Sequence, residues 1–445
     1  MPQRYSKILF PVLILSLSTF RSLAIDPDFA RFLKAKKIQI QELAETQTNK
    51  VPASVEKLFD TISADDYPKE TNLFAQLEEA RGRFREPPLD DMARLLQGPA
   101  WPPISEVSGT YEVFHDWDHK WLQRFGNDII DSIPRGSVYF GGTEDGRFII
   151  SALVKSHRGG DPFFVLTQNQ LADSNYMNYL AGMFAKQVHL PNEEETSQVF
   201  SIYVTGAQQR YQAGKLRLGE DVSITGGQIK VGGVTAVMTI NGLLVKWILD
   251  HNPDRSFFIE ESIAIDELYP NLTPHGLIME LQHKPVPELP ESMIRKDADY
   301  WRKLTGELIG DWIGEKTSTK ELSEFVEKVY LRKDFNGFAG DAAFAKNSAA
   351  RKGFSKLRDS LGGLYAWRAD QPAENRRLMQ QNAELAFRQA FAICPANEVV
   401  DRYSQLLIKL NRTPEAILLV KTALRIDPQN GAFNHLLQTL QDKVH

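Results

Sequence analysis

The chain has 445 residues, of which 42% are hydrophobic and 24% charged, and its formal net charge is −5 at pH 7. This composition is typical of a globular protein with two or three hydrophobic cores, and it excludes a disordered chain. Charges of both signs are interspersed, so we expect neither a basic surface for nucleic acid nor a polybasic membrane patch. Cys394 is the single cysteine, which excludes an intramolecular disulfide and a thiolate metal cluster, and a buried structural thiol is expected there.

Residues 1–24 have the three regions of a secretory signal peptide. Basic residues precede the apolar run 8–17, and Ser22-Leu23-Ala24 places small residues three and one before a cut. An uncleaved anchor helix is the alternative, but Pro11 and Arg21 leave too few uninterrupted apolar residues to cross a bilayer. We therefore expect cleavage after Ala24 and a soluble, exported mature chain, either periplasmic or extracellular, with no later membrane span.

Residues 25–100 form a predicted helical N-terminal segment. Apolar residues recur at helical spacing in 29–36, 55–62 and 73–77, and a turn sequence separates the second helix from the third. No cluster of catalytic residue types occurs in this segment, so it is expected to be a cap or spacer. The proline-rich stretch 99–103 then predicts an extended connector.

His115 and His119 lie four residues apart in a helix predicted over 111–131. That spacing places two imidazoles on one helix face, where they can ligate a metal. The glutamate of the zinc-protease motif is absent, however, and Trp117 and Trp121 indicate a packed amphipathic helix. We therefore predict a structural role for these histidines, with no metal and no cofactor.

The α/β domain is predicted to span residues 101–285 and to have three layers around a mostly parallel sheet. Two β-branched and aromatic runs, 137–140 and 163–166, are each followed by a helical pattern, which indicates a βαβ unit. The other predicted elements are helices at 146–155, 173–185, 197–211 and 234–248, the last largely buried, a hairpin at 222–231, and strands at 256–260 and 277–282. The loop 268–276, which contains His275, is expected to be a rigid connection.

Ligands of open α/β sheets bind beyond the carboxyl ends of the strands, so the residues that follow the predicted strands are the candidate site. After the first strand, Gly141-Gly142-Thr143 can expose backbone N–H groups to an anion at a helix N-terminus. The alternative is a tight strand-to-helix turn that only glycine permits. The glycine spacing lacks the dinucleotide fingerprint, and no Gly-Lys-Ser/Thr sequence follows.

Carboxylates, amides and one arginine complete the candidate ligand-binding set. The full set is Gly141, Gly142, Thr143, Asp145, Arg147, Gln168, Asn169, Asp173, Glu260 and Glu261. If the strands are neighbours, these groups meet at one edge and can hold a cation or polarise a sugar hydroxyl. The alternatives are structural: Asp173 as a helix N-cap, Glu261 as a solvated carboxylate, and Arg147 in a salt bridge. No local motif of a serine or cysteine hydrolase occurs, so the catalytic residues of an enzyme are not identified.

A second proline-rich stretch begins a helical connector over 286–372, and residues 373–445 carry an internal repeat. The segment 390–397 recurs at 423–430, with a period typical of tetratricopeptide-like helix pairs. The stacked pair is expected to bury apolar side chains of both helices, namely Leu406, Leu407, Ile417, Val420 and Leu424.

Several segments resemble those of a family of exported bacterial tetratricopeptide-repeat proteins of unknown function. They are 138–148, 166–173, 240–244, 260–262, 274–279, 354–358 and 363–368. In that family the glycine turn usually reads GGTDPGRF, and Glu144-Asp145 replaces Asp-Pro here. The βαβ layout is also similar, more distantly, to the water-exposed C-terminal domain of protein O-mannosyltransferase-like membrane proteins. Because their membrane-embedded catalytic half is absent here, this resemblance implies an accessory or recognition role.

We therefore expect an exported binding or assembly protein that recognises a protein or peptide through its helical repeats and a small polar or anionic ligand at the strand ends. The competing hypothesis is an enzyme, or an inactive relative related to glycosyltransferases, that acts on a sugar or phosphate ester through Asp145, Asp173 and Glu260 or Glu261. In a third hypothesis the α/β domain is a degenerate scaffold and all function lies in the repeats.

Overall fold

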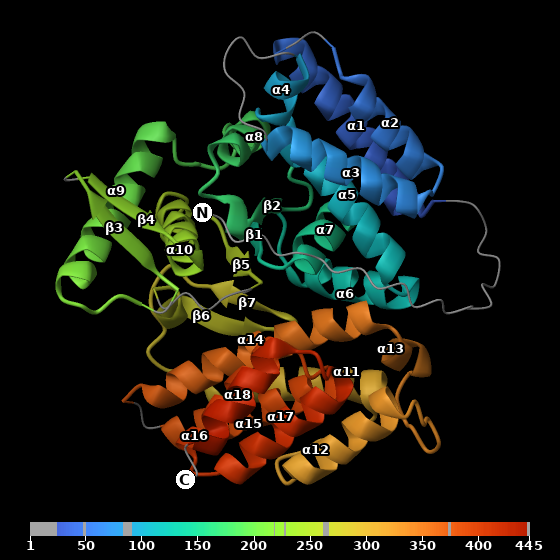
Figure 1. Cartoon of the computed structure of the whole chain (residues 1–445), viewed down its shortest axis with the longest axis vertical. Helices are drawn as coiled ribbons and strands as arrows, with labels where there is room; N and C mark the ends of the chain where they lie inside the picture. Colours follow the sequence, from blue (N-terminus) through green and yellow to red (C-terminus); the bar gives the residue numbers. More distant parts are fainter. Residues whose placement is uncertain are drawn as a thin grey trace.

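The computed structural model describes residues 25–47, 50–82, 91–217, 219–226, 228–260, 267–372 and 375–442. The predicted signal peptide, residues 1–24, and the candidate residue Glu261 lie outside these ranges. In the described part of the chain, no helix is long and apolar enough to cross a membrane. An α/β unit with a small mixed sheet lies between two groups of helices (Figure 1).

The N-terminal segment is helical, as predicted, and has its own hydrophobic core. Its helices are α1 (Pro27–Gln47), α2 (Ala53–Ser63), α3 (Tyr67–Gly82) and α4 (Asp91–Leu96), and they pack with α5 (Trp101–Asp116). The prediction of an extended connector over 99–103 was wrong, because α5 begins at Trp101. Pro102 and Pro103 lie in its first turn, where a backbone N–H has no intrahelical partner and proline costs nothing.

The single helix predicted over 111–131 is two helices. α5 ends at Asp116, and the Asp118 side chain caps α6 (His119–Ser132) by accepting from the Lys120 N–H at 3.1 Å. His115 and His119 therefore do not share a helix face. The ring of His115 stacks on Tyr67 at a centroid distance of 3.9 Å, and His119 lies 3.1 Å from Asp26, so both histidines make structural contacts.

The central sheet has five strands in the order β2-β1-β5-β7-β6. The strands are β1 (Val138–Gly141), β2 (Phe164–Thr167), β5 (Phe257–Ile259), β6 (Leu272–His275) and β7 (Ile278–Leu281). β2, β1 and β5 are parallel, as the βαβ pattern predicted, whereas β7 and β6 add antiparallel pairs. The sheet is therefore mixed and not mostly parallel. The segment 268–276 was predicted to be a connection but contains β6, an edge strand, where Pro274 is tolerated.

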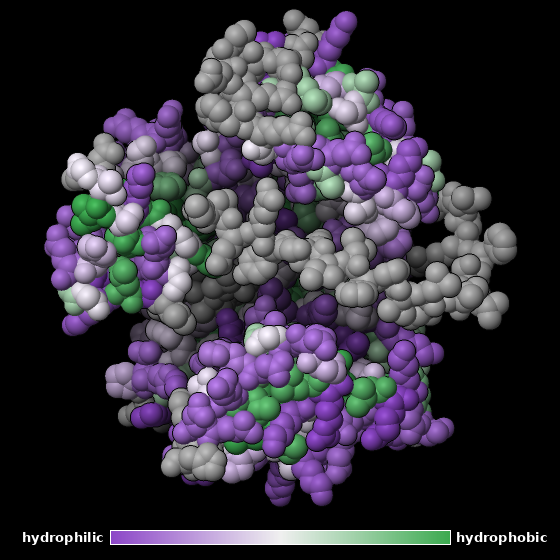
Figure 2. All heavy atoms as spheres, viewed as in Figure 1, coloured by the Kyte–Doolittle hydropathy of each residue, from purple (hydrophilic) through white to green (hydrophobic). Residues whose placement is uncertain are grey.

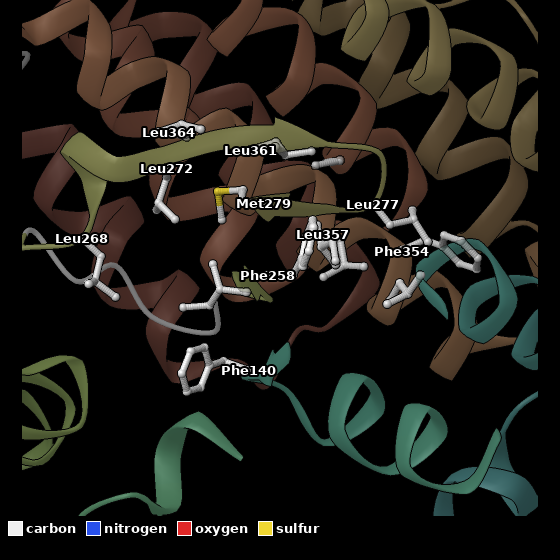
Figure 3. Packing of buried hydrophobic residues seen from close by; sticks show 14 of the residues in the cluster. Phe140, Phe258, Leu268, Leu272, Leu277, Met279, Phe354, Leu357, Leu361 and Leu364 are labelled. Carbon is white, nitrogen blue, oxygen red and sulfur yellow. The ribbon is translucent and has the colours of Figure 1, made fainter. Parts of the chain in front are cut away.

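Helices cover both faces of the sheet. The strand register places Tyr139 and Phe258 on one face, where the Tyr139 hydroxyl lies 3.4 Å from the Gly146 carbonyl of α7 (Glu144–Leu153). On the other face, Met279 lies beside Leu361 and leucines near it on α14 (Ser348–Asp370), as Figure 3 shows. The third layer of the α/β unit is thus supplied by a helix from the segment 286–372.

An arm projects from the sheet on the side opposite α5 and α6 (Figure 1). It follows α8 (Ser174–Phe184) and consists of α9 (Glu193–Gln212), the antiparallel hairpin β3 (Asp221–Thr225) and β4 (Gln228–Gly232), and α10 (Val234–Asp250). The hairpin was predicted correctly. α10 was predicted to be largely buried, but Val234 and Val237 in its first turn are 67% and 47% exposed. Figure 2 shows hydrophobic side chains on the surface of this arm.

Where it is described, the C-terminal part consists of helices and the loops that join them. It contains α11 (Glu291–Ile309), α12 (Thr319–Val326), a π-helical turn (Glu327–Leu331), α13 (Ala342–Lys346), α14, α15 (Arg376–Ile393), α16 (Asn397–Lys409), α17 (Thr413–Ile426) and α18 (Gly431–Asp442). The two copies of the sequence repeat occupy equivalent places, between α15 and α16 and between α17 and α18. Their equivalent asparagines meet, since Asn430 Nδ2 donates to Asn397 Oδ1 at 2.9 Å.

The predicted core of this helix pair is largely correct. Leu406, Leu407 and Val420 are buried, whereas Ile417 and Leu424 are only partly buried and pack at the edge of the same cluster. Cys394, in the turn before α16, is a buried free thiol, as predicted.

Candidate functional site

The glycine turn after β1 is shaped by close packing of α7. A Cβ on Gly141 would lie 2.9 Å from the Cα of Arg147, so only glycine lets the helix turn back onto the strand. Thr143 then caps α7, because its Oγ1 accepts from the Gly146 N–H at 2.9 Å. The segment therefore forms the tight strand-to-helix turn that is the alternative to a ligand loop.

The carboxylate of Glu260 fills the place expected for an external anion. Its Oε2 accepts from the backbone N–H groups of Gly142 at 3.2 Å and Thr143 at 3.1 Å, and the Thr143 hydroxyl donates to Oε1. Glu260 follows β5 and is 1% exposed. The backbone N–H groups of Gly142 and Thr143, just before α7, are thus engaged by a side chain of the protein itself, and its carboxylate lies near the positive end of the helix dipole.

Asp145 stands next to this buried carboxylate in the first turn of α7 and is only partly exposed. Burial, followed by the negative charge of Glu260, raises the pKa of Asp145 to about 7, although a hydrogen bond from Trp117 Nε1 at 2.9 Å opposes that rise. Burial also raises the pKa of Glu260, against the opposing effect of the hydrogen bonds from Thr143 and Gly142. Asp145 therefore exchanges a proton near neutral pH, as a general acid or base must.

The amides that follow β2 are also part of this edge. Asn169 Nδ2 donates to the Gly142 carbonyl at 2.8 Å and so ties the end of β2 to the glycine turn. Gln168 is fully buried, and its side-chain amide makes no hydrogen bond within the described residues.

Two predicted residues have structural roles instead. The Asp173 carboxylate caps α8 by accepting from the Asn175 N–H at 2.8 Å, and it lies 3.7 Å from Arg81. The Arg147 guanidinium lies 3.8 Å from Glu144 and over the ring of Phe148. For both residues the structural alternative is the one observed, and neither lines the pocket described next.

A pocket with a volume of about 1010 Å³ opens beyond the strand ends, and we call it the strand-end pocket. The first wall is formed by the strand ends, with Gly142, Thr143, Glu144, Asp145 and Asn169. The second wall is formed by α14, with Ser348, Arg351, Lys352 and Lys356. The third wall is formed by the two repeat turns and the neighbouring helix ends, with Cys394 to Val399, Ala423, Ile426, Asp427, Asn430 and Phe433. Thus four of the predicted residues share one pocket, with Glu260 directly behind them.

Sequence reasoning missed the α14 wall and Trp117. Gly353 of α14 lies against both parts of the site, because a Cβ there would stand 2.5 Å from the Trp117 ring and 3.3 Å from Asp145 Oδ2. The spacing of Lys352 and Lys356, four residues apart on a predicted helix, is a signal that two cations share one face. Nothing in the sequence indicated that this face would meet the glycine turn.

A second hollow, of about 510 Å³, lies on the face formed by α14, α15 and α16, and we call it the repeat groove. Trp367, Phe387, Leu406 and Leu410 contribute its apolar lining, and Arg376, Arg402, Lys409 and Asp370 its charged lining. Of these, Lys409 and Asp370 pair with each other at 2.6 Å, and Arg402 pairs with the buried Asp359 at 3.2 Å. The groove therefore combines an apolar surface with charged side chains, of which Lys409 and Arg402 are engaged in ion pairs.

A buried polar cluster joins the N-terminal helices to the α/β unit, and no sequence pattern predicted it. Lys36 of α1 pairs with Glu106 of α5 and lies 2.9 Å from His157 Nδ1 and 2.5 Å from the Tyr179 hydroxyl. Burial lowers the pKa of Lys36, and burial together with the charge of Lys36 lowers that of His157 to about 4. The imidazole is therefore neutral at physiological pH, and the cluster is a closed structural contact.

No family model, curated protein or solved structure matches this chain. Within the described ranges, no group of three or more histidine, cysteine, aspartate or glutamate side chains is placed to hold a metal ion.

Proposed function

We propose that the protein is an exported binding and assembly protein with two recognition features. Its C-terminal helices are tetratricopeptide-like repeats that hold a protein or peptide in the repeat groove, and the strand-end pocket holds a small polar ligand. One observation carries the proposal: the strand-end pocket is walled by the glycine turn of the α/β unit on one side and by both repeat turns on another. Ligand in this pocket would therefore touch both parts of the chain.

Further support comes from how the repeats are built. The turns between α15 and α16 and between α17 and α18 have matching sequences and bond to each other through Asn397 and Asn430. Such stacking of equivalent turns is the arrangement expected when neighbouring helix pairs form a continuous surface. The apolar lining of the repeat groove, flanked by charged side chains, suits an extended peptide with apolar and polar side chains.

Ligand binding is tested by native mass spectrometry and thermal shift on residues 25–445 with nucleotides, nucleotide sugars, sugar phosphates and divalent cations. A ligand that binds only the folded state raises the melting temperature by mass action. Ser348→Trp places a bulky ring at the pocket wall and is expected to abolish the shift, whereas Ser201→Trp on exposed α9 is the control. An equal shift in both variants would place binding outside the strand-end pocket.

Partner recognition is tested separately with a photoreactive side chain. A photoreactive side chain at Gln405, which lines the repeat groove, is expected to cross-link one defined polypeptide in cells. The same side chain at Gln441, an exposed position of α18, is the control and is expected to give no such cross-link. Cross-linking of the same species from both positions, or from neither, would count against the groove as the partner site.

A second candidate function is an enzyme that acts on a sugar or phosphate ester. The observation that favours it is Asp145, whose pKa of about 7 suits proton transfer at neutral pH, beside the buried carboxyl of Glu260. Turnover of a sugar phosphate that is lost in Asp145→Asn while the melting temperature is kept would support this candidate. Binding of the sugar phosphate without turnover would instead support the function of a binding protein.

A further inference from the structure

Three cations of α14 line the strand-end pocket without a carboxylate partner. Arg351, Lys352 and Lys356 all face it, and none has an ion pair within 4.0 Å in the part of the chain that the structure describes. Some other surface lysines do form ion pairs, as Lys120 does with Asp341 and Lys409 with Asp370. A protein with a net charge of −5 thus leaves several positive charges unpaired at one cavity wall.

The positions of these cations on the helix make their unpaired positive charge electrostatically unfavourable. Lys352 and Lys356 are four residues apart on α14, where like charges repel each other. Arg351 is held by its neighbour, since its guanidinium lies 4.0 Å from the centroid of the Tyr330 ring. A bound anion would reduce the repulsion between the two lysines. Because the Tyr330 ring already holds the Arg351 side chain, an anion would lose little free energy in ordering it.

The carboxyl groups of the first wall do not neutralise this charge fully. Lys356 lies near enough to Asp145 and Glu260 to oppose the rise of both pKa values, yet burial still raises them. Asp145 therefore carries only part of a negative charge at neutral pH, and Glu260 is already bonded to the backbone of the glycine turn. Glu144, the remaining carboxyl group of this wall, is exposed and lies 3.8 Å from Arg147. Among the described residues, no carboxylate therefore lies within ion-pair distance of the three α14 cations, and they can contact an anion in the pocket.

The third wall offers different chemistry. Glu398, in the first turn of α16, and Asp427, in the turn before α18, line the pocket, and carboxylate oxygens accept hydrogen bonds from hydroxyl groups. A volume of about 1010 Å³ also exceeds the space that a lone phosphate or sulfate ion fills. The pocket therefore suits a molecule with an anionic end and a hydroxylated body.

We propose that the strand-end pocket binds a small polyhydroxylated molecule that carries one phosphate monoester. The phosphate lies against Lys352, Lys356 and Arg351, and the hydroxyl groups lie toward Glu398 and Asp427. A phosphate monoester has three acceptor oxygens and a charge between about −1.5 and −2 at pH 7, which matches a wall of three cations better than one carboxylate does. The assignment of this ligand class rests on the proposed function of the pocket as a ligand site.

The test is isothermal titration of the mature full chain with glucose 6-phosphate, glucose and inorganic phosphate at low and high salt. Glucose 6-phosphate is expected to bind more tightly than either part alone, and its affinity is expected to fall as salt rises. Lys352→Gln and Lys356→Gln should each weaken it about tenfold, the loss typical of one charge-assisted hydrogen bond. Lys303→Gln, on an exposed position of α11, is the control and should leave the affinity unchanged.

The outcomes separate this inference from the proposed function. If glucose binds as tightly as glucose 6-phosphate, or if the two pocket variants bind like the control, the phosphate assignment is overturned while the pocket can still hold another polar ligand. If none of the three probes binds, the assignment is also overturned, and the wider ligand screen then decides whether the pocket is a site at all. Lys352 is exposed, so Lys352→Gln keeps the test valid if Lys356→Gln does not fold.

Discussion

The α-carbon of Gly146 lies directly against the carboxylate of Glu260. A Cβ at Gly146 would stand 1.6 Å from Oε2, far inside van der Waals contact, although the two residues are over 100 positions apart in sequence. This contact allows Glu260 to reach the backbone N–H groups of Gly142 and Thr143 just before α7. Burial, and then the charge of the same carboxylate, raises the pKa of Asp145 at the pocket wall. The strand-end pocket therefore depends on one glycine that no binding motif would single out.

Gly146→Ala is expected to destabilise the protein by about 2–4 kcal/mol, because the new methyl group must displace a buried carboxylate and break its hydrogen bonds. The matched control is Gly182→Ala in α8, where nothing lies within 4 Å of the added Cβ. That change should be neutral or stabilising by up to about 1 kcal/mol, since alanine favours a helix. Urea denaturation of both variants measures the difference, and equal stabilities would refute the contact.

Asp145→Asn is expected to change how stability depends on pH. The pKa of Asp145 is raised from 3.8 to about 7, so between these values the folded state binds more protons than the unfolded state. The contribution of this group to stability is therefore complete at low pH and is lost as pH rises through about 7. Asparagine can still accept the hydrogen bond from Trp117 and does not titrate.

The free energy of unfolding of the asparagine variant, relative to wild type, should rise from about pH 4 to about pH 7 and then level off. The charged groups that act on Asp145 are Glu260, Glu144 and Lys356, and they are the same in both proteins. Denaturation curves at half-unit pH steps provide the measurement. Parallel pH profiles for the two proteins would show that Asp145 ionises normally.

Lys36→Met should cost about 3–5 kcal/mol, because it leaves the Glu106 carboxylate buried without its cation. The neighbouring residue offers a matched control. Lys37 lies 3.7 Å from exposed Asp60, and removing such a surface pair costs less than about 1 kcal/mol. Thermal or urea denaturation distinguishes the two substitutions, and a small effect of Lys36→Met would mean that the cluster is not closed to water.

Asn430→Ala is expected to loosen α18 and the contact between the repeat turns. The Asn430 Oδ1 caps α18 by accepting from the Phe433 N–H at 3.2 Å, and its Nδ2 donates to Asn397. Loss of a helix cap typically costs about 1 kcal/mol. Hydrogen exchange should become faster in the first turn of α18 and at the turn that contains Asn397, whereas Gln438→Ala, at an exposed position of the same helix, should leave both unchanged.

Local patterns in the sequence predicted local structure well. The βαβ unit, the hairpin at 222–231 and the cap by Asp173 were correct because each depends on residues a few positions apart. The errors arose where a signal had two meanings. Pro102 and Pro103 fit both an extended connector and a helix N-terminus, and the two histidines kept helical spacing although Asp118 begins a new helix between them.

Only the first wall of the strand-end pocket was predicted from the sequence. Gly142, Thr143, Asp145 and Asn169 were identified because parallel strands bring their carboxyl ends together. The cations of α14 could not be assigned to the site, since they come from a helix about 200 residues later whose docking against the glycine turn depends on Gly353 and the packing of Trp117. Long-range packing of this kind leaves no periodic signal in the sequence.

The most direct measurement is an anomalous difference map from crystals of the mature chain soaked in selenate, a dianion that titrates little between pH 5 and 8. We expect a selenium peak in the strand-end pocket in contact with Lys352 and Lys356, and loss of that peak in Lys352→Gln. Selenate bound only at other surfaces, with the pocket wall of α14 free of it, would contradict the claim that this cavity is an anion-binding site.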